Sequence, residues 1–312
     1  MFRFSRTLLC LTLCLGGQLR HHAVQAQVLP KAELTFLTSS WTGDRFEDGR
    51  PKIADDWINR ARAIGLDDAW TILKNKGYNN QFVGGWKPLH ADHPIVGRAV
   101  TATFMPSRPD VDQHIVTRGH ENGRQGNSNT WPIEVLTKGD VYVADGFGKI
   151  AGGTLIGQTL GNAIFNKTGN GVVFDASVRD LEGLMEIKGF NAFVRDYHPS
   201  YLEESTLMGL NGPTRIGGAI VLPGDLVLAQ REGVLFIPAH LVEHVVTRAE
   251  FILLRDKFGF EMIKNGKYNT GQIDNQWTTE IKSSFLKWLH ENPADVKLTE
   301  KQLDEIMKDR TW

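Results

Sequence analysis

The stretch 172-VVFDASVRDLEGL-184 joins a strand-like apolar run to a group of charged side chains. Its first three residues are apolar, as in strands that are covered on both faces of a sheet. Asp175, Arg179 and Asp180 follow, and an apolar, helix-like segment comes next. The charges suit either a solvated polar loop or a binding site, since α/β sheets build their sites at the carboxyl ends of strands. The stretch predicts an α/β fold with a functional edge after this strand.

Six further strand-like segments occur between about residues 94 and 245, and they alternate with helix-like ones. They are 95–105, 140–146, 190–196, 215–222, 226–230 and 233–238. Residues 154–169 fit a helix that connects two strands and ends at Gly169, because glycine readily takes the left-handed conformation at a helix end. Alternation of this kind predicts an α/β sandwich.

Helical patterns flank this central region. Residues 54–78 place apolar side chains at helix-face spacing, and residues 246–312 contain two pairs typical of capping boxes, Thr247 with Glu250 and Thr299 with Gln302. Between these pairs, one helix face carries Trp277, Ile281, Phe285, Trp288 and Leu289. That stripe predicts a tail helix that docks on the core or on a neighbouring subunit.

The first 26 residues have the layout of a secretory signal. Arg3 and Arg6 precede the apolar run 7-TLLCLTLCLGG-17, and 23-AVQA-26 supplies small residues before the expected cleavage. Four parts are therefore predicted: a signal peptide (1–26), an N-terminal extension with helices (27–90), the α/β domain (91–245) and a C-terminal helical extension (246–312). We expect a bacterial protein that is exported to the periplasm or secreted.

The composition excludes several classes of function. Both cysteines, Cys10 and Cys14, lie in the signal segment, so the mature chain has no thiol for a disulfide, a zinc site or a nucleophile. Loss of three arginines with that segment leaves a net charge of about −4, from 35 basic and 36 acidic residues in the whole chain. This balance disfavours a nucleic-acid partner. No other apolar run is long enough for a membrane span, so no membrane contact is expected after signal removal.

Two weaker patterns indicate other sites. The glycines of Gly146-x-Gly148-x-x-Ala151 follow a strand, and Asp175 closes the next one, which is the layout of a dinucleotide-binding turn. The alternative is an ordinary glycine-rich turn. Histidines occur in 90-HADH-93 and 240-HLVEH-244 at spacings that suit a metal, although neither segment holds a complete ligand set.

Arg179 and Asp180 together carry a more specific hypothesis. The planar guanidinium of arginine binds a carboxylate through two parallel hydrogen bonds. A neighbouring aspartate suits Mg²⁺ or Mn²⁺, of which Mg²⁺ keeps several waters and takes few protein carboxylates. Such a pair fits a small-molecule 2-oxo acid, whose keto oxygen a metal polarises as a Lewis acid.

Four ordered segments resemble one known family. They are 95-IVGRAVTATF-104, 139-GDVYVADGFG-148, 171-GVVFDASVRDLEGL-184 and 216-IGGAIVLPGDLVLAQREGVLFIP-238. The chain resembles the regulator of ribonuclease activity A (RraA-like) family over about residues 94–245. That family includes metal-dependent 4-hydroxy-4-methyl-2-oxoglutarate aldolases and oxaloacetate decarboxylases, and its members are often labelled dimethylmenaquinone methyltransferases. The resemblance implies a layered sandwich of the swivelling β/β/α type, assembled as a homotrimer or hexamer with sites between subunits.

The resemblance also implies roles for individual residues. The family's lyases carry an aspartate, twenty intervening residues and then Arg-Asp. Here Arg179 matches the catalytic, substrate-binding arginine and Asp180 the metal ligand, while Gln158 stands at the position of the first aspartate. Position 158 thus belongs to the implied catalytic and substrate-binding set, but an amide cannot ionise to act as a base. Backbone N–H groups of Thr159 and Leu160 are implied to hold the pyruvyl group.

Three functions follow as expectations. The first is an exported carbon–carbon lyase, of the aldolase or decarboxylase type, that depends on Mg²⁺ or Mn²⁺ and acts on a small oxo acid or an oxidised sugar derivative. The second is a non-catalytic relative that binds a ligand or protein. The third is a nucleotide-dependent oxidoreductase that uses the turn at Gly146 and Gly148.

Overall fold

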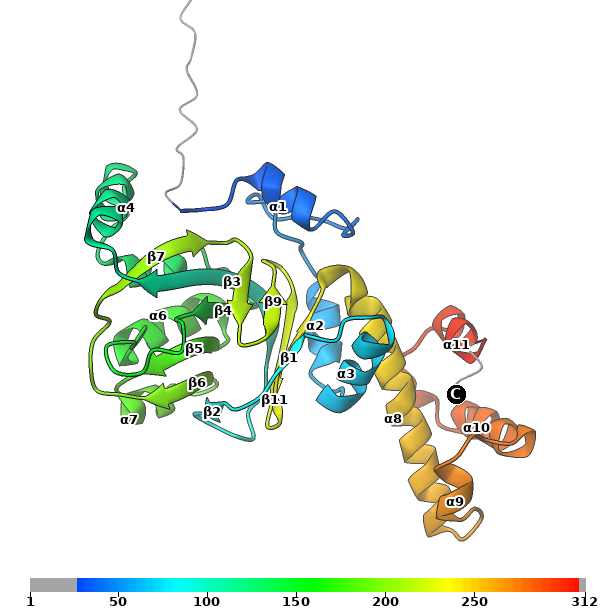
Figure 1. The fold of residues 1–312 in the computed structure, drawn as a ribbon. Coiled ribbons are helices and arrows are strands. Elements are labelled where there is room, and N and C mark those ends of the chain that lie inside the picture. The colour runs from blue at the N-terminus through cyan, green and yellow to red at the C-terminus, as the bar shows by residue number, and fades with distance from the viewer. Residues whose placement is uncertain (1–26, 309–312) are drawn as a thin grey trace, which may run out of the picture.

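A mixed β-sheet forms the centre of the molecule (Figure 1). The structure, a computed structural model, describes residues 27–308, so the predicted signal peptide lies outside the described residues. The strand order is β1-β11-β10-β3-β4-β5-β6-β2, and β7 pairs with β3. These strands are β1 (Phe82–Val83), β2 (Lys87–Pro88), β3 (Ile95–Pro106), β4 (Asp140–Asp145), β5 (Val172–Val178), β6 (Ala192–Tyr197), β7 (Ser205–Leu210), β10 (Leu226–Gln230) and β11 (Gly233–Ile237).

Strands β3 to β6 run parallel, whereas β10 and β11 are antiparallel to their neighbours. The carboxyl ends of the parallel strands therefore meet at one edge of the sheet. β5 is the stretch that begins at Val172, and it lies in the middle of this parallel part. The predicted α/β class is confirmed.

The two faces of the sheet are covered differently. On one face lie α5 (Trp131–Glu134), α6 (Gln158–Thr168) and α7 (Leu181–Met185), which share an apolar core with β3 to β6. Gly169 ends α6 in the left-handed conformation, as predicted. On the other face lies a hairpin of β8 (Thr214–Ile216) and β9 (Ala219–Val221). The prediction of one strand over 215–222 is wrong, because Gly217, with φ of +55°, turns the chain back.

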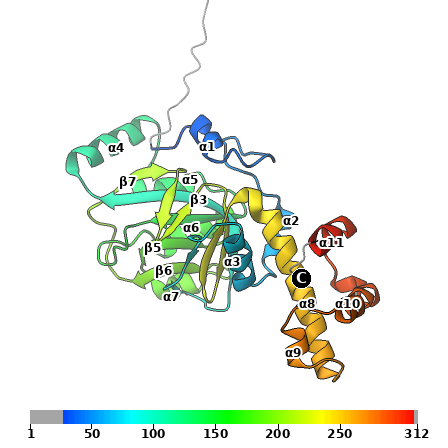
Figure 2. The same ribbon diagram turned by 45° about the vertical axis from the view of Figure 1, so that its right-hand side comes forward.

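Helices from both ends of the described chain pack together beside β10 and β11 (Figure 2). They are α2 (Asp55–Ala61), α3 (Leu66–Asn75) and the long α8 (Val242–Lys264). Helix α1 (Lys31–Leu37) comes before them in the chain and is not part of this cluster. The predicted capping box at Thr247 is wrong, because Thr247 and Glu250 lie inside α8. Glu250 instead accepts hydrogen bonds from Arg60 of α2, at 2.6 Å from Nη2 to Oε2.

The C-terminal helices form a separate apolar cluster around Phe258 of α8. They are α9 (Thr270–Ile273), α10 (Thr279–Glu291) and α11 (Glu300–Met307), and in both views they lie along α8, away from β4 to β6 (Figures 1 and 2). The capping box of Thr299 and Gln302 is confirmed at the start of α11. The aromatic stripe of α10 contacts Phe258, so this tail docks on its own chain. Within residues 27–308, no helix is both long and apolar enough to cross a bilayer.

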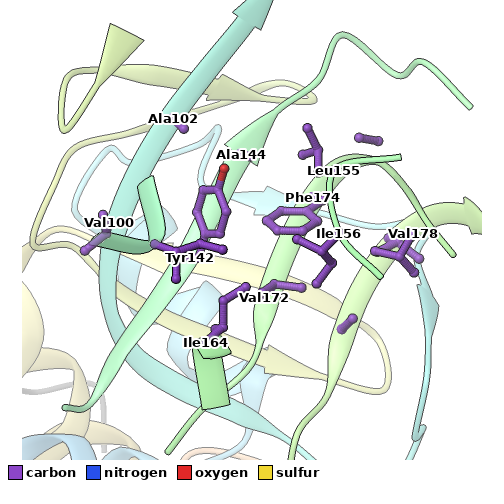
Figure 3. Close-up of a cluster of buried hydrophobic side chains, with 14 of the residues drawn as sticks. Val100, Ala102, Tyr142, Ala144, Leu155, Ile156, Ile164, Val172, Phe174 and Val178 are labelled. Atoms are coloured by element: carbon purple, nitrogen blue, oxygen red, sulfur yellow. The ribbon is translucent and has the colours of Figure 1, made fainter. Parts of the chain in front are cut away.

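Tyr142 offers a test of core packing. It lies on β4 with its ring edge-on to Phe174, at 4.8 Å between centroids (Figure 3). Its hydroxyl is buried without a hydrogen-bond partner among the described residues, and burial raises the pKa of the phenol. Because an unsatisfied buried hydroxyl costs free energy, Tyr142→Phe is expected to raise the free energy of unfolding by about 1 kcal/mol.

Urea denaturation measures this change. Tyr268→Phe is the matched control, since the Tyr268 hydroxyl lies 2.9 Å from Ser284 Oγ and its removal breaks a hydrogen bond. The control is expected to lower stability. A Tyr142→Phe variant that is less stable than the native protein would contradict the prediction.

Candidate active site

A cavity of about 520 Å³ opens at the carboxyl end of β5. Its walls come from segments that are far apart in sequence: α4 (Pro109–Glu121), residues 126–130, residues 154–157, the first turn of α6, and residues 201–205. Arg179 and Asp180 lie in its wall. The predicted functional edge of the sheet thus coincides with a cavity.

The backbone after β5 places Arg179 and Asp180 at this edge. The N–H of Arg179 donates to Ile156 O at 3.1 Å, which ties the end of β5 to the segment before α6. Asp180 takes the left-handed conformation, with φ of +55° and ψ of +49°, and α7 begins directly after it. Residues other than glycine rarely adopt the left-handed conformation, and those that do are often found at functional sites.

Gly157 allows Asp180 to lie against the start of α6. The N–H of Gln158 lies 3.3 Å from Asp180 Oδ2, and Arg179 Nε lies 3.9 Å from the same oxygen. A Cβ atom on Gly157 would be only 2.3 Å from that oxygen. The carboxylate therefore occupies a space that a side chain at position 157 would fill.

The guanidinium of Arg179 is available to a ligand. Its Cζ atom lies 4.4 Å from the centre of the Tyr201 ring, which holds the cation over an aromatic face. Among residues 27–308 it has no hydrogen-bond partner, and 31% of the side chain is exposed. Tyr201 has no motif around it in the sequence, so sequence reasoning did not identify it.

The first turn of α6 supplies backbone donors. Thr159 and Leu160, the residues that the resemblance implies to hold an acid group, both line the cavity. The free N–H groups at a helix start attract anions, and α6 contains 11 residues. Arg179 and this helix start therefore both favour a negative ligand in the cavity.

Gln158 is oriented differently from its two neighbours. Its side chain lies against Gly183 of α7, where an added Cβ would be 2.4 Å from Gln158 Cδ. Gln158 does not line the cavity, although its backbone N–H faces Asp180. The absence of a side chain at Gly183 thus makes room for the longer glutamine.

The glycine-rich turn after β4 is hydrogen-bonded to the neighbouring strand β5. The N–H groups of Gly146 and Gly148 both donate to Asp175 O. The next helix, α6, begins only at Gln158, so this turn does not open onto a helix start as a dinucleotide-binding turn does. The carboxylate of Asp175 binds Arg195, at 2.6 Å from Nε to Oδ1, and is already paired.

Two other residues near the strand ends are also held by local contacts. Burial raises the pKa of the Asp145 carboxyl, which accepts a hydrogen bond from Phe147 N at 2.8 Å. His198 Nδ1 lies 2.9 Å from Ser200 Oγ. Neither residue lines the cavity.

The donor set around Asp180 fits a weakly coordinated hard cation. Within the described part of the chain, no three His, Cys, Asp or Glu side chains converge on one point, so the two histidine segments do not form such a group either. Asp180 presents a carboxylate that is 48% exposed beside the cavity. One carboxylate with open space around it suits Mg²⁺, which keeps several waters and completes its shell with substrate oxygens.

The fold and the cavity define an α/β protein in which an arginine, an aspartate and a helix start meet at the carboxyl end of a central strand. The chain belongs to the RraA-like family, because the family model Aldolase/RraA matches residues 51–236. This family includes aldolases, decarboxylases and non-catalytic ribonuclease inhibitors; its aldolases are generally Mg²⁺-dependent, and its members form oligomers.

The chain is also similar to individual proteins and to solved structures. An uncharacterized protein of Methanocaldococcus jannaschii is 26% identical over 64% of this chain and 90% of its own. A protein of Halalkalibacterium halodurans is 31% identical over 53% of this chain and 69% of its own length. It is provisionally named a 4-hydroxy-4-methyl-2-oxoglutarate aldolase. The crystal structure of Streptomyces coelicolor RraAS2 superposes on this chain with a TM-score of 0.59 at 24% identity. The match covers 68% of this chain and all of RraAS2, which is described as an unusual member of the RraA family of ribonuclease ES inhibitors.

Proposed function

We propose that this protein is an exported carbon–carbon lyase, of the aldolase or decarboxylase type, that uses Mg²⁺ or Mn²⁺ and acts on a small oxo acid or an oxidised sugar derivative. The observation that carries the proposal is the adjacent placement of Arg179 and Asp180 in a cavity that also contains the start of α6. Export rests on the sequence pattern of residues 1–26, and a trimer or hexamer rests on the family's tendency to form oligomers.

Each group in the cavity has a distinct role in this proposal. Arg179 binds the substrate carboxylate with its free guanidinium edge, and Tyr201 keeps that guanidinium in place. The N–H groups of Thr159 and Leu160 orient the acid end of the substrate. Asp180 holds the metal, which when bound supplies Lewis-acid polarisation of a keto oxygen.

Gln158 favours decarboxylation over aldol cleavage. Aldol cleavage removes a proton from a hydroxyl group, which requires a base. An amide does not ionise, and the side chain of Gln158 is directed to Gly183. Loss of carbon dioxide needs no such proton removal, because the bond between a second carboxylate and the carbon next to the keto group breaks and its electron pair passes towards the keto oxygen. The same residue is the observation in favour of the second candidate, a non-catalytic binding protein.

Calorimetric titration of Mg²⁺ and Mn²⁺ into the mature, chelator-stripped protein, with and without oxalate as a mimic of pyruvate enolate, tests the proposal. We expect oxalate to bind only with metal, and Asp180→Ala to weaken metal binding at least about tenfold, because it removes the charged ligand. Glu186→Ala is the matched control, since Glu186 is an exposed acid after α7 that does not line the cavity. Absence of metal and oxalate binding in the native protein would rule out the lyase.

Turnover then separates the lyase from the binding protein. Release of carbon dioxide or of pyruvate from an oxo acid, dependent on metal and lost in Asp180→Ala, supports a lyase. Metal-dependent oxalate binding without turnover of any oxo acid in a substrate screen supports the non-catalytic relative.

A further inference from the structure

We infer that the cavity selects acids with a polyhydroxylated carbon chain, a class that deepens and rests on the proposed function of the Arg179–Asp180 site. The cavity volume of about 520 Å³ lies in the usual range of about 300–1,000 Å³ for ligand pockets. A three-carbon acid held at Arg179 would fill only a small part of this volume. The remaining space is therefore available to a substrate tail.

The wall beside this space is rich in neutral polar groups. We call residues 127–130 the polar wall; they are Asn127, Ser128, Asn129 and Thr130, and all four line the cavity. Within residues 27–308, the Asn127 amide and the Ser128 hydroxyl have no hydrogen-bond partner. Asn129 donates from Nδ2 to Leu155 O at 3.0 Å, which leaves its Oδ1 free. Amides and hydroxyls both donate and accept, which matches the hydroxyl groups of a ligand.

The charges around the cavity disfavour a carboxylate at the terminal carbon of the tail. Arg179 is the one arginine or lysine among the described residues that line it. Asp112 of α4 also lines the cavity, and its Oδ1 accepts a hydrogen bond from Thr206 at 2.8 Å. A carboxylate away from Arg179 would meet this like charge with no second arginine or lysine in the described lining to pair with. The tail that fits is uncharged and polar.

The polar wall is held in place without a ligand. Thr130 Oγ1 donates to Asn127 O at 2.8 Å, and the fully buried Trp131 follows directly and donates from Nε1 to Gln125 O at 3.1 Å. Gly119 of α4 packs against the same tryptophan, since a Cβ there would be 2.1 Å from its ring. A preformed wall loses little entropy on binding, so its hydrogen bonds contribute to selection.

Three unreactive acids of equal chain length test the inference. Gluconate, 2-hydroxyhexanoate and 2-hydroxyadipate share a carboxylate and a 2-hydroxyl, but their tails are polyhydroxylated, apolar and anionic. Their affinities are measured by calorimetry at saturating Mg²⁺, with oxalate, which has no tail, as the probe of the head-group site. We expect gluconate to bind at least about tenfold more tightly than either analogue, because a site built for hydroxyl groups rejects ligands that lack them.

Variants of the polar wall connect this preference to its residues. Ser128→Ala and Asn127→Ala are each expected to reduce the preference for gluconate several-fold, while Gln125→Ala, an exposed side chain just outside the cavity, preserves it. If an analogue binds as tightly as gluconate, or if both wall variants keep the full preference, while oxalate still binds with metal, the inference is wrong and the proposed function stands. If oxalate does not bind with metal, both are wrong.

Discussion

Asp140→Ala is expected to lower the free energy of unfolding by about 3 kcal/mol, because it removes a fully buried carboxylate that two buried arginines share. Arg50 keeps its pair with Asp48 and Arg98 its pair with Asp55, which limits the loss. Asp140 is fully buried at the start of β4. Its Oδ2 lies 3.1 Å from Arg50 Nη1 and its Oδ1 lies 3.5 Å from Arg98 Nε. Both arginines are themselves buried, with 2% and 4% of their side chains exposed.

The Asp140 carboxylate also accepts two hydrogen bonds from a neighbouring threonine. The N–H and the hydroxyl of Thr137 both donate to its Oδ2 at 2.9 Å. The pair with Arg50 connects the segment before α2 to the amino-terminal end of the parallel strands, opposite the cavity. Chemical denaturation followed by tryptophan fluorescence measures the loss. The matched control is Glu291→Ala, which removes an exposed i,i+4 pair with Lys287 and is expected to leave the midpoint unchanged. An Asp140→Ala protein as stable as this control would contradict the prediction.

Gly157→Ala is expected to weaken metal binding at least about tenfold while stability changes little. The added methyl group would be 2.3 Å from Asp180 Oδ2, so the carboxylate must leave its position beside Gln158 N. Displacement of a binding group by about 1 Å is enough to cost a large factor in function. The backbone accepts alanine, because Gly157 has φ of −124° and ψ of −166°, an extended conformation.

Calorimetric titration of Mg²⁺ measures the affinity, and thermal unfolding confirms that the fold is intact. Gly218→Ala is the matched control, since no atom lies within 4 Å of an added Cβ there. If Gly157→Ala binds metal as tightly as the native protein, the position of the Asp180 carboxylate seen here does not matter for metal binding.

Local patterns in the sequence determined the parallel part of the sheet and the end of β5. Continuous apolar runs predicted β3 to β6, because strands covered on both faces need apolar side chains at every position. Arg179 and Asp180 follow the last residue of β5, so their location at the functional edge needed only the position of that strand. Gly169 ended its helix as predicted, because glycine lacks the Cβ atom that makes the left-handed conformation costly.

The same local reasoning failed where distant segments compete with it. Thr247 and Glu250 have capping-box spacing, but packing of α8 against α2 and α3 extends that helix through them. Glu250 then pairs with Arg60, 190 positions away. A capping motif contributes about 1 kcal/mol, which is less than the burial of an apolar helix face.

Contacts between distant segments decided the site itself. The stacking of Tyr201 on Arg179, the polar wall at residues 127–130 and the position of Gln158 against Gly183 appear only in the tertiary structure. Loops have no hydrophobic period, so their side chains carry no signal of which cavity they face. The sequence by itself therefore determined which strand ends in a cation and a carboxylate. Only the folded chain, by bringing α4, α6 and three loops to that strand end, decided what surrounds them.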